Sequence, residues 1–145
     1  YMLIKAAALV TVADARGPET DQGALLRYLG ELVWHPGTAL AEYIQWAEVP
    51  DDPLAARATM QYGDLEASGV FHFTPDGDVQ GFETLRYYNR KDSATLEKWQ
   101  VRVDPDSFRE FEDIRIPARS TVIWLLETGE FTWLELELED LKYPF

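Results

Sequence analysis

The sequence contains no cysteine in 145 residues. This absence excludes disulfide bonds, thiolate nucleophiles and cysteine-ligated metal sites. Histidine is also scarce, and the two that are present, His35 and His72, are not spaced as zinc ligands are. Glycine-rich phosphate-binding loops and the Gly-x-Ser-x-Gly turn of hydrolases are missing as well. The sequence therefore predicts neither a metal site nor a cofactor.

The sequence also has no long hydrophobic run and little positive charge. No apolar stretch reaches the roughly 18–20 residues of a membrane-spanning helix, and the apolar start lacks the basic segment of a signal peptide. Lysine and arginine number 13 against 26 aspartate and glutamate, which gives a net charge of -13. This charge disfavours binding to nucleic acid or to an anionic membrane surface. It leaves the compartment of the protein open.

The excess of negative charge predicts that stability depends on salt. Like charges repel one another in the folded state, and salt screens them over a Debye length of about 10 Å at 0.1 M. We expect the melting temperature, measured by circular dichroism, to rise from low salt to about 1 M NaCl. A flat or falling curve would show that self-repulsion contributes little.

Apolar residues make up 46% of the chain and aromatic residues 13%, which is typical of a globular domain with a sizeable core. The length predicts a single domain over residues 1–145. Short runs of alternating apolar and polar residues, bounded by turn signals, predict strands. These runs are residues 2–13, 44–49, 56–62, 65–74, 79–88, 96–103, 120–127 and 131–143, with two further short strands within 108–117.

One segment, residues 21–33, has apolar residues at helical spacing instead. Its apolar stripe consists of Leu25, Tyr28, Leu29, Leu32 and Val33. Thr20 or Asp21 is the predicted N-cap, because both side chains accept hydrogen bonds from the free N–H groups of a first turn. Gly30 costs about 1 kcal/mol relative to alanine within a helix, which indicates close packing against a sheet.

Together these elements predict an α+β fold in which a curved antiparallel sheet of about seven to nine strands forms a half-barrel. One main helix packs on its concave apolar face. A helix of about 14 residues is roughly 21 Å long, whereas each strand adds about 4.8 Å to the width of the sheet. We therefore expect a sheet that curls round the helix or an apolar face that stays partly open, and in both cases a cavity.

The helical segment 25–36, the sequence Ile-Arg-Ile-Pro at 114–117, and Trp124, Trp133 and Tyr143 carry a family resemblance. They resemble an uncharacterised family of bacterial and archaeal conserved proteins over nearly the whole chain. Members of that family are longer at the N-terminus, so the resemblance implies that an N-terminal part is missing. The fold pattern is also similar to the half-barrel of bacterial lipoprotein carriers, which implies carriage of a lipid-like ligand.

Apolar side chains on the concave face form the candidate binding site, and we predict no catalytic residue. The expected lining consists of Trp34, Trp46, Phe71, Phe73, Trp99, Trp124, Leu134 and Leu136. Such a pocket suits an apolar or amphipathic, lipid-like small molecule, because each buried methylene contributes about 0.8 kcal/mol.

Two other functions stay open. The chain is a structural or assembly module if its first strand, with Leu3, Ala7 and Leu9, has an open edge that pairs with a partner, for example in a homodimer. It is a carboxylate-based enzyme if acidic groups converge in the same concavity. Glu135, Glu137 and Glu139 would lie in a row on one strand face, about 7 Å apart.

Overall fold

The computed structural model describes residues 2–6, 10–15, 17–90 and 93–142, with side chains described from residue 17 onward. The strands are β1 (Met2–Ala6), β2 (Val10–Ala15), β3 (Ile44–Val49), β4 (Asp52–Tyr62), β5 (Leu65–Phe73), β6 (Val79–Asn89), β7 (Ala94–Val103), β8 (Phe108–Phe111), β9 (Ile114–Pro117), β10 (Arg119–Leu126) and β11 (Gly129–Glu137). The helices are α1 (Pro18–Gly30) and three short 3-10 helices, η1 (Glu31–Val33), η2 (Pro36–Leu40) and η3 (Pro105–Ser107).

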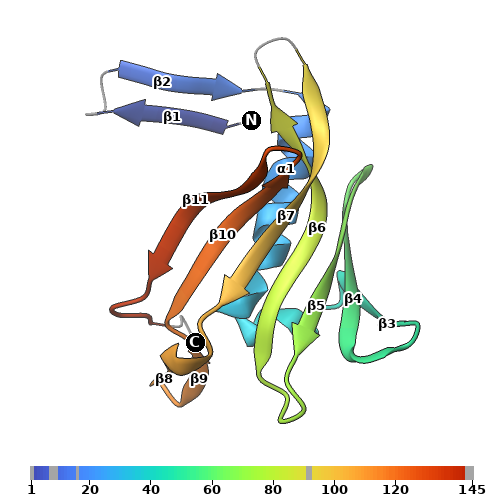
Figure 1. The fold of residues 1–145 in the computed structure, drawn as a ribbon, viewed down its shortest axis with the longest axis vertical. Coiled ribbons are helices and arrows are strands. Elements are labelled where there is room, and N and C mark those ends of the chain that lie inside the picture. The colour runs from blue at the N-terminus through green and yellow to red at the C-terminus, as the bar shows by residue number, and fades with distance from the viewer. Residues whose placement is uncertain (1, 7–9, 16, 91–92, 143–145) are drawn as a thin grey trace.

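Seven strands form one antiparallel sheet in the order β11-β10-β7-β6-β5-β4-β3. Figure 1 shows this sheet twisting in front of α1, with the β1–β2 hairpin beyond one end and the β8–β9 hairpin beyond the other. Sequential strands are neighbours because short turns join them, and Gly63 and Gly77 adopt the positive φ angles (58° and 91°) that two of these turns require. The predicted α+β fold, one main helix on a curved antiparallel sheet, is confirmed.

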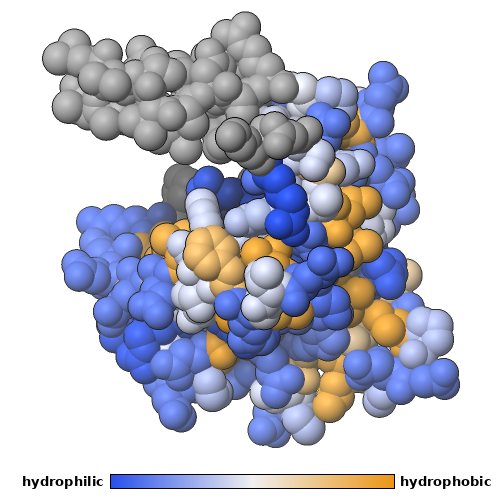
Figure 2. Space-filling view, turned by 45° about the horizontal axis from the view of Figure 1, so that its top comes forward, coloured by the Kyte–Doolittle hydropathy of each residue, from blue (hydrophilic) through white to orange (hydrophobic). Residues whose placement is uncertain are grey.

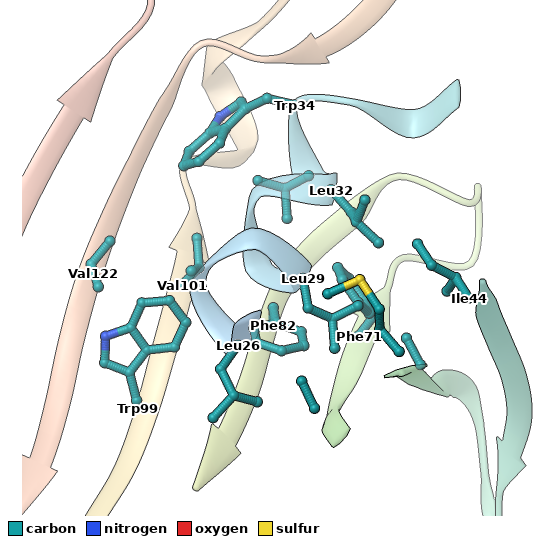
Figure 3. Packing of buried hydrophobic residues seen from close by; sticks show 14 of the residues in the cluster. Leu26, Leu29, Leu32, Trp34, Ile44, Phe71, Phe82, Trp99, Val101 and Val122 are labelled. Atoms are coloured by element: carbon teal, nitrogen blue, oxygen red, sulfur yellow. The ribbon is translucent and has the colours of Figure 1, made fainter. Parts of the chain in front are cut away.

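The core lies between α1 and the middle of the sheet. The helix packs mainly against β5 and β6, and Figure 3 shows Leu26 and Leu29 pointing from it toward Phe71, Phe82 and Trp99. A Cβ atom at Gly30 would lie 3.2 Å from atoms of both Phe82 and Trp99. The close packing predicted at this glycine is therefore confirmed, and a side chain there would require the rings of Phe82 and Trp99 to shift.

The helix begins earlier than predicted. Gly17, rather than Thr20 or Asp21, is the N-cap, and its carbonyl oxygen accepts from the N–H groups of both residues at 3.1 and 3.0 Å. Pro18 opens the first turn, where its fixed φ suits the helix and its missing N–H leaves no donor unsatisfied. The apolar spacing carries no signal for such a start.

The buried stripe of α1 is rotated by about one residue from the prediction. Leu26 is buried, whereas Leu25 is half-buried and Tyr28 is exposed. The last predicted turn, residues 31–33, is the 3-10 helix η1, which changes the angle per residue and still buries Leu32 and Val33.

Two predicted strands are corrected. Residues 2–13 form a hairpin of β1 and β2, paired only with each other in the described part of the chain and separate from the main sheet. The run contains no glycine, proline or asparagine that would predict two strands in place of one. Residues 7–9, which include the predicted edge residues Ala7 and Leu9, lie outside the described residues. The last strand, predicted as 131–143, ends at Glu137, because the next N–H, of Leu138, donates to Ala118 outside the sheet.

Gly69 on β5 lies under the ring of Phe82, and the structure predicts that it tolerates no side chain. A Cβ atom there would overlap the Phe82 ring and come within 2.9 Å of the Glu83 carbonyl oxygen. We expect Gly69→Ala to lower the free energy of unfolding by about 1–3 kcal/mol, the usual cost of overpacking, in urea denaturation. Gly37→Ala is the control, because a Cβ at Gly37 meets nothing within 4 Å. Equal stability of the two variants would contradict the packing described.

Candidate functional site

The eight predicted lining residues are spread across the sheet from β3 to β11. Trp46, Phe71 and Phe73 form one group, with ring centroids 5.3 Å apart for Trp46–Phe71 and 6.5 Å for Phe71–Phe73. Trp99 and Trp124 are cross-strand partners. Leu134 and Leu136 lie on β11, at the opposite edge of the sheet from Trp46 on β3.

Burial differs among these residues. Trp34, Phe71, Trp99 and Trp124 are buried in the continuous core cluster. Phe73 and Leu136 are half-buried at its margin. Trp46 is exposed on β3, where its indole N–H donates to the Ala39 carbonyl at 2.8 Å. Trp46 and Leu134 thus combine exposure with a place on the concave face, at opposite edges of the sheet.

An apolar strip on β11 is one part of the concave face that α1 leaves uncovered. We call Phe131, Leu134 and Leu136 the β11 strip. They pair across the sheet with Trp124, Val122 and Ser120 and therefore share the face of the core. Phe131 is 44% exposed and Leu134 is 36% exposed. Figure 2 shows that apolar patches of this kind interrupt an otherwise largely hydrophilic surface.

Beside this strip, the guanidinium of Arg86 lies over the rings of Trp99 and Trp124. We call these three residues the arginine–tryptophan cluster. The guanidinium carbon of Arg86 lies 5.2 Å from the ring centroid of Trp99 and 5.6 Å from that of Trp124. Tyr88 packs edge-on against Trp124, with ring centroids 5.0 Å apart. The helix passes close to the same guanidinium, since a Cβ at Gly23 would lie 3.2 Å from its Nε atom.

The environment of Arg86 opposes its charge. Burial lowers the pKa of this guanidinium, and the nearby positive charge of Arg27 lowers it further. Glu97, the cross-strand partner of Arg86, does not neutralise it, because the Glu97 carboxylate accepts instead from Arg90 at 2.9 Å and Thr95 at 2.8 Å. A guanidinium stays protonated despite such a shift, so the site holds a positive charge.

Sequence reasoning missed Arg86, although the signal was present. On β6 the alternation that points Phe82 toward the core also points Thr84 and Arg86 to the same face. A charged residue at an inward position is expensive to bury unless it is paired or used. Arg86 is therefore an inward-facing charge that the hydrophobic pattern alone does not report.

A cleft of about 370 Å³ is lined both by Gln22 and Leu26 of α1 and by charged residues of the outer face of the sheet, and sequence reasoning missed it too. It forms where β5 and β6 part, beyond the hydrogen bond that Thr84 Oγ1 donates to the Ser68 carbonyl at 2.7 Å. Its lining includes Arg57, Glu83 and Lys98 from the sheet. Strand separation of this kind depends on tertiary packing and has no local sequence signal.

Glu83 interacts with several charged and polar side chains around this cleft. Burial raises the pKa of its carboxyl group, but hydrogen bonds from Gln100 (2.9 Å) and Lys98 (3.2 Å), with the charges of Lys98 and His72, outweigh burial and leave the pKa below its usual range. The carboxylate is thus held ionised and paired. Such a group suits an ion-pair network rather than a proton donor, which would need a raised pKa.

The row of glutamates considered for catalysis is exposed. Glu135 and Glu137 lie on β11, and Glu137 forms an ion pair with Arg109 at 3.5 Å. Glu139 lies beyond the end of that strand.

Within residues 2–142, as far as they are described, no group of three histidine, aspartate or glutamate side chains could hold a metal ion. In the same part of the chain, no helix is long and apolar enough to cross a membrane.

Comparison with known sequences places the chain in a family. The model of a family of unknown function, DUF6544, matches residues 1–136, and the protein belongs to this family. The comparisons with curated proteins and with solved structures found no match. The family resemblance drawn from the C-terminal and helical segments thus has a counterpart in a defined family, whereas the similarity to lipoprotein carriers has none among solved structures.

Proposed function

We propose that this protein binds an amphipathic, lipid-like ligand whose apolar chain lies along the β11 strip. The observation that supports this most is the position of α1. The helix covers the middle of the sheet and leaves Phe131 and Leu134 exposed on the same face as the core. Exposed apolar surface continuous with a core is typical of binding sites. A lipid chain gains about 0.8 kcal/mol for each methylene that it buries there.

A carrier role, like that of the half-barrel lipoprotein carriers, belongs to this proposal. It requires a site that releases its ligand, and an open strip at the sheet edge meets that requirement better than an enclosed pocket. The four residues Trp34, Phe71, Trp99 and Trp124 then act as the rigid, packed wall on which the site is built. Only Leu134 and Leu136 of the predicted lining contact the ligand chain directly, together with Phe131.

An assembly role through a sheet edge is the competing proposal. β11 and β3 are the edges of the main sheet, and an edge strand has free backbone groups that can pair with another chain. The net charge of -13 opposes the close approach of two copies of this chain at this edge. Two copies are therefore a poorer occupant of the strip than a small amphipathic molecule.

Titration with a fluorescent fatty acid tests the proposal. We expect saturable binding by the wild type and at least about tenfold weaker binding by Leu134→Glu, because a charge then replaces apolar contact in the strip. Leu96→Glu is the matched control: Leu96 is 52% exposed on β7 and points to the outer face, opposite to Trp99. Absence of binding by the wild type, or equal loss in both variants, would overturn the proposed site.

A further inference from the structure

The proposed function leaves open which polar group the ligand carries. Resting on that function, we infer that Arg86 binds the ligand's head group and that this group is a carboxylate, so that the ligand class is a long-chain carboxylic acid. The argument starts from the guanidinium itself. It lies over two indole rings, at 5.2 and 5.6 Å from their centroids, on the same face as the β11 strip.

Contact with the indole rings does not use the N–H donors of Arg86, and its Nε and Nη2 atoms lie beside Gly23 of α1, where a Cβ would be 3.2 and 3.4 Å away. Arginine has five N–H donors that lie in the guanidinium plane, and contact with an aromatic face uses none of them. Among the residues whose side chains are described, Arg86 forms no ion pair and donates no side-chain hydrogen bond. The planar fork of donors matches the two oxygens of a carboxylate, which it binds through two parallel hydrogen bonds.

Among the residues with described side chains, no carboxylate compensates the charge of Arg86. The carboxylate of Glu97, its cross-strand partner, is held by Arg90, and the carboxylate of Glu31 is held by Arg27 at 2.8 Å. A half-buried cation without a counter-ion is unfavourable in the ligand-free protein. A bound carboxylate would relieve this cost, and a single negative charge would balance the single guanidinium.

The route from Arg86 to the β11 strip follows the strand pairing. Thr84, Trp99, Trp124 and Phe131 form one cross-strand row on the concave face. Arg86 stands two residues along β6 from Thr84, and its guanidinium reaches back over Trp99 and Trp124. Trp99 and Phe131 are two strands apart, about 10 Å. A chain whose carboxylate meets Arg86 therefore passes Trp124 and reaches the strip.

The net charge of -13 means that a preference for an anionic ligand would be a specific test of this inference. Long-range repulsion should weaken the binding of any anion to such a protein, so a preference for an anionic ligand requires a specific local cation. We would compare lauric acid, lauryl alcohol and lauryl phosphate by isothermal titration calorimetry at one salt concentration. The three ligands share a chain and differ in the head group, so chain burial cancels in the comparison.

We expect lauric acid to bind the wild type at least about tenfold more tightly than lauryl alcohol, because hydrogen bonds to a charged group are the stronger ones. The preference should disappear in Arg86→Gln and persist in part in Arg86→Lys, which keeps the charge but loses the fork. Arg57→Gln, on the outer face, is the control and should keep it. Far-UV circular dichroism confirms that each variant is folded.

The outcomes separate the two proposals. Equal binding of acid and alcohol by the wild type would overturn the role of Arg86 and leave the apolar site intact, and this comparison needs no variant to fold. Tighter binding of the phosphate than of the acid would overturn the assignment of a carboxylate. A preference that survives in Arg86→Gln would assign the head group to another residue. Binding of none of the three ligands would overturn the proposed function itself.

Discussion

Phe82→Ala is expected to lower the free energy of unfolding by about 3–5 kcal/mol, the usual cost of deleting a buried phenyl ring. Phe82 is 1% exposed and lies at the centre of the aromatic core, with its ring centroid 4.7 Å from that of Phe71 and 6.2 Å from that of Trp99. Its ring also fills the space over Gly69. Removal of the ring would open a cavity between the helix and both halves of the sheet.

The measurement is urea denaturation followed by tryptophan fluorescence and circular dichroism. Tyr62→Ala is the control, because Tyr62 is 76% exposed near the tip of the β4–β5 hairpin and contributes little packing. We expect its effect to stay within about 0.5 kcal/mol. A loss of less than about 1 kcal/mol for Phe82→Ala would mean that the core collapses around the vacancy, which the contact of two other rings and a helix makes difficult.

Leu29→Ala is expected to cost about 2–5 kcal/mol. Leu29 is fully buried on the face of α1 that meets the sheet, and Figure 3 shows it directed toward Phe71 and Phe82. Because α1 is the only long helix in the described part of the chain, no other element can cover the middle of the sheet. Loss of this contact therefore weakens the attachment of the helix as a whole.

Arg27→Ala is the matched control on the opposite face of the same helix. Arg27 is exposed and forms an i,i+4 ion pair with Glu31 at 2.8 Å. Such a pair contributes about 0.3–0.5 kcal/mol. Similar midpoints for Leu29→Ala and Arg27→Ala in a denaturant titration would show that the helix does not pack on the sheet through this face.

The sequence by itself determined the class of fold, because local patterns carry that information. Period-two alternation and explicit turn residues predicted most of the strands, and the helical spacing predicted α1. The tight approach at Gly30 was also predicted, since a glycine inside a helix is costly without a packing reason. Boundaries were less exact: the start at Pro18 and the pairing of β1 with β2 depend on signals that propensity does not contain.

The candidate site was decided by the tertiary structure. Alternation assigns a residue to a face of a strand, but it does not say where on that face the helix will lie. The helix covers β5 and β6, so Phe71 and Trp99 became core, whereas Phe131 and Leu134 stayed exposed at the β11 edge.

The environment of Arg86 likewise depends partly on local sequence and partly on tertiary structure. The pattern of β6 places it on the inner face, yet only the pairing of β6, β7 and β10 brings its guanidinium over Trp99 and Trp124. These residues are distant in sequence, and their contact depends on strand order and register. Local sequence fixes periodicity, whereas burial and electrostatic environment are properties of neighbours that only the assembled sheet brings together.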